Sequence, residues 1–239
     1  MKNLRYSLIL FLALGITYCT DGQIRRTVYG NNHVVKKERE AGKFAGLRVS
    51  SGIDVYLKQG DKESIQVEAD ENLHEYIITE IRDGVLHVYS EANIMRAEMK
   101  RVYVSMKDIN SLKTSSAGDI IGETPVKTDR LDLSASSAGD IKLEIYVKEA
   151  EANISSSGDV TLTGVADMLN ADLSSAGDLN AYGLEVREAD VSASSAGDAD
   201  ISVSERLRAR SSSAGDINYR GNPKYVDAHS SSAGGVHRR

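Results

Sequence analysis

The chain has 239 residues, enough for one or two domains, and a formal net charge of −6. Aromatic residues make up only 5% of it, with no Trp and two Phe, which excludes a large core built on aromatic rings. The negative charge argues against a nucleic-acid partner, because binding phosphates requires a basic surface.

The N-terminal residues have the pattern of an export signal. Lys2 and Arg5 precede a short apolar run (SLILFLALGI), which is too short to span a bilayer comfortably as a permanent helix. We assign residues 1–22 as a signal peptide. The chain is therefore predicted to be exported, and to lie in the periplasm, at the outer membrane or on the cell surface.

Cys19 is the single cysteine, and it ends this apolar run. One interpretation is a signal-peptide residue that is lost on cleavage after Gly22. The other is the lipidated N-terminal cysteine of a bacterial lipoprotein, because residues 16–19 (ITYC) resemble a lipobox in which Tyr18 fits poorly. In that case the protein would meet a membrane only through a lipid anchor at Cys19.

Residues 23–42 are polar and mixed in charge, which predicts a partly disordered linker. From residue 43 the pattern favours strands, over 65–69, 76–82, 85–89 and 102–106, with a short helical turn at 72–74. Asp83-Gly84 between two strand patterns is a hairpin signal. We expect residues 43–110 to form a β-rich N-terminal part that caps the rest of the domain.

Residues 111–239 carry an internal repeat. The motif Ser-Ser-Ala-Gly-Asp recurs seven times with small variations, and successive glycines are 18 to 21 residues apart. Apolar residues stand two positions after and six positions before each glycine, with polar residues at the other parity. This is the period of strands with one buried face. The repeated glycines are Gly118, Gly139, Gly158, Gly177, Gly197, Gly215 and Gly234.

The repeat predicts an all-β fold, a single-stranded β-solenoid with rungs of about 19–20 residues, each made of two or three short strands joined by corners. Stacking the rungs at about 4.8 Å would pair their backbones and bury a narrow aliphatic interior. Residues 43–239 would form this domain. Its far end is expected to close near residues 219–239, where Gly221-Asn222-Pro223 forms a turn and the terminal charges oppose edge pairing.

The corner glycines are predicted to occupy a left-handed bend, which is costly for a residue with a Cβ. One of the two serine rows before them should point inward, with its hydroxyls bonded to one another or to the corner backbone. These serines are Ser116, Ser137, Ser156, Ser175, Ser195, Ser213 and Ser232.

The chain from Phe44 to about Val236 resembles a known family. FAGL at 44–47, VYLKQG at 55–60, GVLHV at 84–88, the serial corners and YRGNP at 219–223 are similar to the family "Putative auto-transporter adhesin, head GIN domain", found mainly in Bacteroidetes-type bacteria. The resemblance implies a right-handed β-helix, an exported location and an adhesin-like role. It carries no catalytic residues over to this chain.

Six corner aspartates would form a column, in which neighbours about 4.8 Å apart repel by roughly 0.9 kcal/mol at the dielectric of water. We expect carboxylates that accept corner N–H groups and are solvated. A calcium ladder is the alternative, although one carboxylate per rung is few for an ion that takes six to eight oxygen ligands. No other metal site and no cofactor are predicted. The six are Asp119, Asp140, Asp159, Asp178, Asp198 and Asp216.

Repetition in every rung indicates structure rather than catalysis, so we predict that the chain is not an enzyme. A polysaccharide-active β-helix enzyme would need long loops, and the repeat spacing leaves no room for them. The favoured function is adhesin-like binding of a glycan or an envelope protein, with Tyr146, Tyr182 and Tyr219 as candidate contacts. For Tyr146 and Tyr182, the favoured interpretation is that they simply cover strand surface. A structural or assembly element of the envelope is the second candidate.

Overall fold

The structure is a computed structural model that describes residues 26–239. The predicted signal peptide and Cys19 lie outside the described residues. Within residues 26–239, no helix is long and apolar enough to cross a membrane. Almost every element in this range is a strand, and the one 3-10 helix among the described residues is η1 (Glu71–Leu73).

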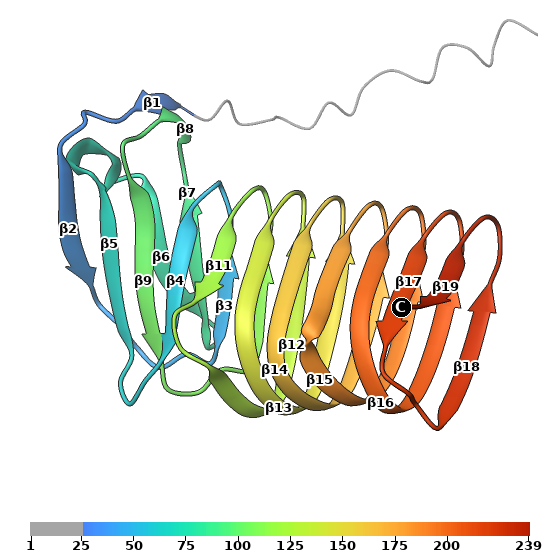
Figure 1. The fold of residues 1–239 in the computed structure, drawn as a ribbon. Coiled ribbons are helices and arrows are strands. Elements are labelled where there is room, and N and C mark those ends of the chain that lie inside the picture. Colours follow the sequence, from blue (N-terminus) through green and yellow to red (C-terminus); the bar gives the residue numbers. More distant parts are fainter. Residues whose placement is uncertain (1–25) are drawn as a thin grey trace, which may run out of the picture.

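The repeat region is a β-solenoid, as predicted, and Figure 1 shows its rungs stacked side by side along one axis. Every pairing between successive rungs is parallel, and next to the corners it places like residues in register, for example Asp159 beside Asp178. Away from the corners, the register shifts once between β14 and β15 and twice between β15 and β16. The strands are β10 (Ser111–Thr114), β11 (Asp119–Gly122), β12 (Val126–Ser136), β13 (Asp140–Ser155), β14 (Asp159–Leu173), β15 (Asp178–Ala193), β16 (Asp198–Ser211), β17 (Asp216–Arg220), β18 (Tyr225–Ser230) and β19 (Gly235–Arg238).

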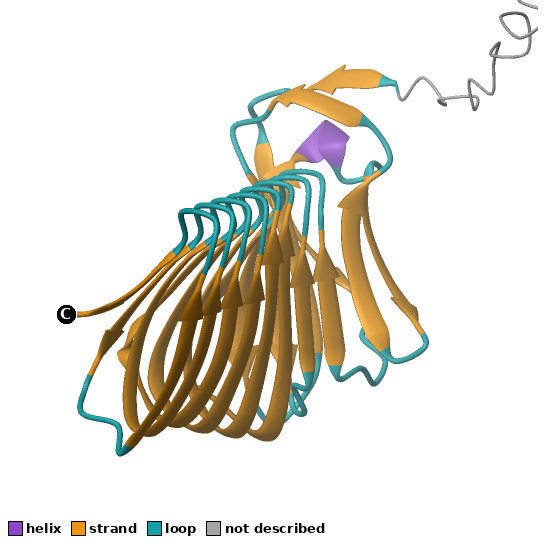
Figure 2. Cartoon of the chain, turned by 90° about the vertical axis from the view of Figure 1, so that its right-hand side faces the viewer, coloured by secondary structure: helices purple, strands orange, loops and turns teal. Residues whose placement is uncertain are grey.

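The middle rungs are not divided into two or three short strands, although separate strands do occur in the first repeat rung (β11 and β12) and in the last (β17 and β18). Between corners, β13 to β16 run as continuous strands of 14 to 16 residues that bend once in the middle. At this bend two successive residues, such as Asp167 and Met168, are both exposed, which shifts the parity of the buried positions. Each rung therefore has one sharp corner and one gradual bend (Figure 2).

We call the halves that leave the corners the outgoing sheet and the halves that run into them the returning sheet. In β14, the outgoing half buries Val160 and Leu162, and the returning half buries Leu169, Ala171 and Leu173. The two sheets face each other across this aliphatic interior. The narrow spacing accounts for a core of Ala, Val, Ile and Leu, with Phe44 as the one buried aromatic side chain among residues 26–239.

The first rung belongs to the N-terminal part of the chain. Its strands β3 (Gly46–Val49) and β4 (Asp54–Gln59) pair in parallel with β10 and β11. On their other side they pair with β7 (Val85–Ser90) and β9 (Lys100–Met106). Beyond these lie β5 (Ser64–Asp70) and β6 (Ile77–Arg82), both antiparallel to their neighbours. These strands cover one end of the solenoid (Figure 1).

The local signals in this part are confirmed. Asp83 and Gly84 join β6 to β7, and both have the positive φ of a tight hairpin turn, 51° and 74°. The expected helical turn is η1, which directly follows β5.

The segment expected to be a disordered linker is partly ordered. β2 (Val34–Arg39) pairs antiparallel with β5, and β1 (Thr27–Tyr29) pairs with β8 (Asn93–Arg96). The prediction was wrong for these residues because their polar side chains belong to edge strands, where one face and one edge remain in water.

The C-terminal end does not close as expected. The turn after β17 forms at Gly221, with φ 103°, but every residue of β18 is exposed. Within the described residues, β18 pairs only with β16 and β19 pairs only with β17. The last rung therefore leaves both of its outer edges open.

Candidate functional site

At each corner, the residues with a left-handed backbone are the second serine of the motif and the residue after it, not the glycine. In the corner of the fourth motif, Ser175 and Ala176 have φ of 52° and 57°, and the corresponding pair is left-handed in all seven motifs. None of the seven repeat glycines has a positive φ of this kind. The prediction that the glycines form the bend was therefore wrong.

Close contact between rungs explains the glycines instead. A Cβ on Gly158 would lie 2.6 Å from the carbonyl carbon of Ala135, and a Cβ on Gly177 would lie 2.8 Å from that of Ile154. No corner motif precedes the first rung, and there the buried Ile53 stands at the position that glycine occupies in the later rungs. The Ile53 carbonyl accepts the N–H of Asp119, just as the Gly118 carbonyl accepts the N–H of Asp140.

The serine row expected to point inward is exposed in every motif. These serines contribute their backbone, because the carbonyl of each accepts the N–H of the preceding corner, as between Ser195 and Ala176 at 3.1 Å. Buried hydroxyls occur two residues before these serines, where Thr114 and Ser211 donate to the carbonyls of Gly118 and Gly215. The corners are thus joined by a backbone ladder.

The six corner aspartates do form a column along the outgoing sheet, and Asp54 of the first rung extends it. Burial raises the pKa of Asp119, Asp159 and Asp178, and the neighbouring carboxylates in the column raise it further. Within residues 26–239, no group of three or more His, Cys, Asp or Glu side chains is arranged to hold a metal ion.

The three candidate tyrosines do not form a cluster. Tyr146 lies on β13 with 42% of its surface exposed. The guanidinium of Arg220 covers the ring of Tyr182 at 3.9 Å, and Tyr219 packs against the core. The aromatic residue that sequence reasoning missed is Tyr225, on β18, which is 65% exposed. The sequence did contain a signal for it: Tyr225 lies six residues before Ser231, at a position that the alternation of apolar and polar residues assigns to the outer face.

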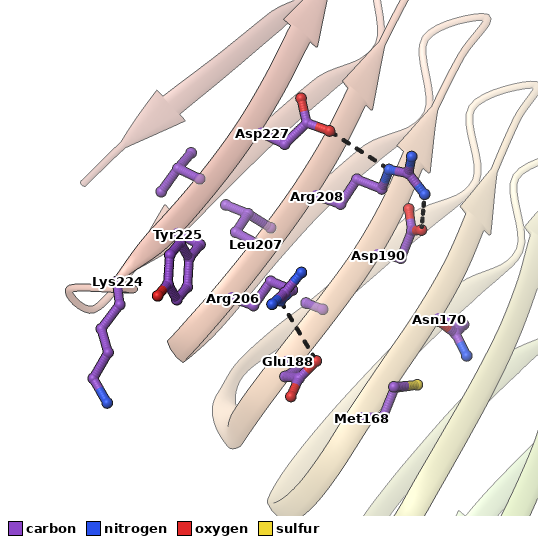
Figure 3. A pocket seen from close by; sticks show the side chains of 12 residues that line it. Met168, Asn170, Glu188, Asp190, Arg206, Leu207, Arg208, Lys224, Tyr225 and Asp227 are labelled. Atoms are coloured by element: carbon purple, nitrogen blue, oxygen red, sulfur yellow. Dashed lines mark ion pairs between the residues drawn. The ribbon is translucent and has the colours of Figure 1, made fainter.

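Tyr225 borders a shallow groove on the outer face of the returning sheet, at the C-terminal end (Figure 3). We call it the β14–β18 groove. Its volume is about 750 Å³, and it crosses four successive rungs. Met168 and Asn170 come from β14, Glu188 and Asp190 from β15, Arg206 and Arg208 from β16, and Tyr225 and Asp227 from β18.

Ion pairs between neighbouring rungs hold the arginines of the groove. Arg208 lies between two carboxylates, with Nη1 3.5 Å from Asp190 and Nε 3.6 Å from Asp227. Arg206 Nε is 3.8 Å from Glu188 Oε2. These distances exceed those of direct hydrogen bonds, so the guanidinium donors and the Glu188 and Asp190 carboxylates remain free to bond to a ligand. Asp227 Oδ1 lies 2.9 Å from His229 Nε2.

The groove is electrically balanced and has one aromatic surface. Lys224 and two arginines face Glu188 and two aspartates, so three cations match three carboxylates. The guanidinium of Arg206 lies 5.4 Å from the centroid of the Tyr225 ring. An exposed ring beside fixed donors and acceptors is suited to a polar, uncharged ligand with an apolar face.

Solved structures share this fold. A "putative adhesin" from Bacteroides fragilis superposes with a TM-score of 0.83 at 17% identity, covering 89% of this chain and 100% of that one. A "putative lipid binding protein" from Parabacteroides distasonis has a TM-score of 0.73 at 21% identity, with 90% and 100% covered. A "putative adhesin" from Parabacteroides merdae has a TM-score of 0.66 at 22% identity, with 90% and 99% covered.

No curated protein matches the chain. Residues 43–223 match the family described as "Putative auto-transporter adhesin, head GIN domain", which is more than half of the sequence. The match includes the first rung, the capping strands and most of the corners. The chain belongs to this adhesin-like family.

Proposed function

We propose that the protein is an exported, non-catalytic, adhesin-like binding protein, and that the β14–β18 groove binds a neutral glycan. The observation that carries the proposal is the exposed ring of Tyr225 beside three cations and three carboxylates. A sugar presents C–H groups on one face and hydroxyls around its edge, so it can stack on a tyrosine while its hydroxyls bond to arginine and carboxylate groups.

The charge balance favours a neutral ligand over an acidic or a basic one. With as many carboxylates as cations along the groove, a charged sugar would meet as much repulsion as attraction. The exported location is supported by the pattern of residues 1–22 and by the family. Short corners and bends, without long loops, support a role other than catalysis.

Glycan-array binding tests the proposal, with Tyr225→Ala as the test variant and Tyr146→Ala as the control. Both tyrosines are exposed, but Tyr146 lies on the outgoing sheet, away from the groove. We expect the wild type and Tyr146→Ala to bind the same neutral glycans and Tyr225→Ala to lose at least about tenfold in affinity, a loss of about 1.4 kcal/mol. Binding that survives Tyr225→Ala, or no glycan binding at all, would contradict the proposal.

A structural or assembly role in the envelope is the second candidate. The open strand edges at the C-terminal end favour it, because unpaired edges can pair with another chain. A pull-down from envelope extract separates the two: an assembly role predicts stable protein partners that Tyr225→Ala does not affect.

A further inference from the structure

At the C-terminal end of the solenoid, β18 and β19 expose both unpaired strand edges and apolar side chains. Val226 and Ala228 stand in register with the buried Leu207 and Ala209 of the preceding rung, yet both are exposed, and 47% of the surface of Val226 is accessible. Val236 of β19 is likewise only partly buried, although it is in register with the fully buried Ile217. This end therefore exposes apolar side chains from core positions together with the unpaired backbone N–H and C=O groups of β18 and β19.

The opposite end of the same molecule does not fit this surface. There the outgoing sheet continues three strands beyond β4, through β9, β5 and β2. The returning sheet continues only two strands beyond β3, through β7 and β6. The N-terminal end is thus stepped, and β1 and β8 project beside it (Figure 1). If the C-terminal end of one copy stacked on the N-terminal end of another, strands could pair in only one of the two sheets.

A second C-terminal end does fit. β18 runs into the last corner and β19 runs out of it, so the two open edges are opposite in direction and lie in opposite sheets. A two-fold axis between the sheets and parallel to the strands would place each β18 beside the β19 of the other copy. Both pairings would be antiparallel, and corner would meet corner. We propose that this end is a dimer interface between two copies of the chain.

Side-chain parity and charge then select a register. Since inward positions must face inward positions, Ala228 pairs with Val236 of the second copy. This pairing sets the outward Asp227, which already lies 2.9 Å from His229 of its own chain, opposite His237 of the second copy, and it sets Val226 opposite Arg238. A protonated His237 has the charge that complements Asp227. By symmetry each contact occurs twice.

A shift of two residues is disfavoured. It would move Arg238 from opposite Val226 to opposite Ala228, and it would put Val236 opposite Ser230 and His229 opposite His237. The apolar pair of Ala228 and Val236 would then be lost, and two histidines would face each other. The Ala228–Val236 register is therefore the one the edges support.

Sedimentation velocity tests the interface on the full chain. We expect a concentration-dependent monomer–dimer equilibrium for the wild type. Val226→Lys, which puts a charge into the interface, should shift it to monomer. Val165→Lys is the matched control, because Val165 is a valine of similar exposure (43%) in the middle of the solenoid. A wild type that stays monomeric, a growing series of oligomers, or a dimer unaffected by Val226→Lys would each overturn the proposal.

Cross-linking tests the register without relying on a destabilising variant. In a full chain that carries Cys19→Ser, Asp227→Cys combined with His237→Cys should form a covalent dimer with a short bis-maleimide. Either cysteine alone should not, because each would face a residue without a thiol. Dimers from the single variants, or none from the pair, would overturn the assignment. The interface does not depend on the glycan proposal, because both of its tests read the oligomeric state and neither reads ligand binding.

Discussion

Gly177 lies directly over the backbone of Ile154 in the preceding rung, and a Cβ on the glycine would meet the Ile154 carbonyl at 2.8 Å. Neither backbone can move without breaking the ladder that joins the corners. The glycine is therefore required by contact between rungs, although its own φ is ordinary.

Gly177→Val should destabilise the protein by about 1–3 kcal/mol, since it overpacks a site bounded by backbone. Asp178→Asn, one residue further on, keeps the shape of an exposed side chain and should change stability by less than about 0.5 kcal/mol at neutral pH. Urea denaturation of both variants checks this. Equal midpoints would contradict the close contact.

Ala176→Gly should leave stability unchanged or raise it. Ala176 has φ 57°, where a side chain costs about 1 kcal/mol or more, and its own Cβ is exposed. The gain in the folded state is offset by the greater freedom of glycine in the unfolded chain. A loss of stability as large as that of Gly177→Val would show that the corner strain is assigned to the wrong residue.

Stability should rise as pH falls toward the titration of the aspartate column. Asp119, Asp159 and Asp178 have folded-state pKa values raised above the ordinary 3.8. The folded protein thus binds protons more readily than the unfolded chain, and this contribution is full below 3.8 and lost as pH rises through the folded-state pKa. Replacing all three by Asn should raise the melting temperature at neutral pH and flatten its dependence on pH. An unchanged profile would exclude repulsion along the column.

His74 should have the opposite effect at the N-terminal end. Its imidazole is buried: Nε2 donates to the Val35 carbonyl at 3.1 Å, and Nδ1 has no partner within the described residues. Burial lowers its pKa below the ordinary 6.5, and nearby Lys37 and Arg39 contribute to the shift. This stabilisation of the neutral form is present above 6.5 and is lost as pH falls through the lowered value.

Hydrogen exchange checks this prediction. After correction for the intrinsic rate, amides of β2 and η1 should exchange faster as pH falls from about 7 to about 5, while β14 stays protected. His74→Gln should remove the pH dependence. A uniform response along the chain would contradict a local cause.

Calcium should leave the protein unchanged if the aspartate column is only a set of solvated turn residues. Calorimetry with calcium should then show no heat and no shift in melting temperature. Saturable binding that Asp159→Asn weakens would establish the calcium ladder instead.

The periodic part of the fold could be predicted from the sequence because its signal is repeated. Seven similar corners and strict alternation define rungs, register and core without tertiary information. The Asp83-Gly84 hairpin is equally local, since its turn chemistry lies in two residues.

Features that arise between rungs could not be predicted in the same way. A regular recurrence of glycines is compatible with a left-handed bend or with close backbone contact, and only the stacked neighbour, such as Ala135 below Gly158, distinguishes them. The same holds for the groove, where Glu188, Arg206 and Tyr225 come from three rungs and meet only once the register is known.

The backbone ladder at the corners has a consequence for how such proteins change in length. Each corner bonds to those immediately before and after it, so duplication or loss of one whole motif would keep the backbone ladder continuous. The distance between the capped end and the open end can therefore grow or shrink in steps of about 4.8 Å. The repeat number would therefore set how far the groove stands from the capped N-terminal end.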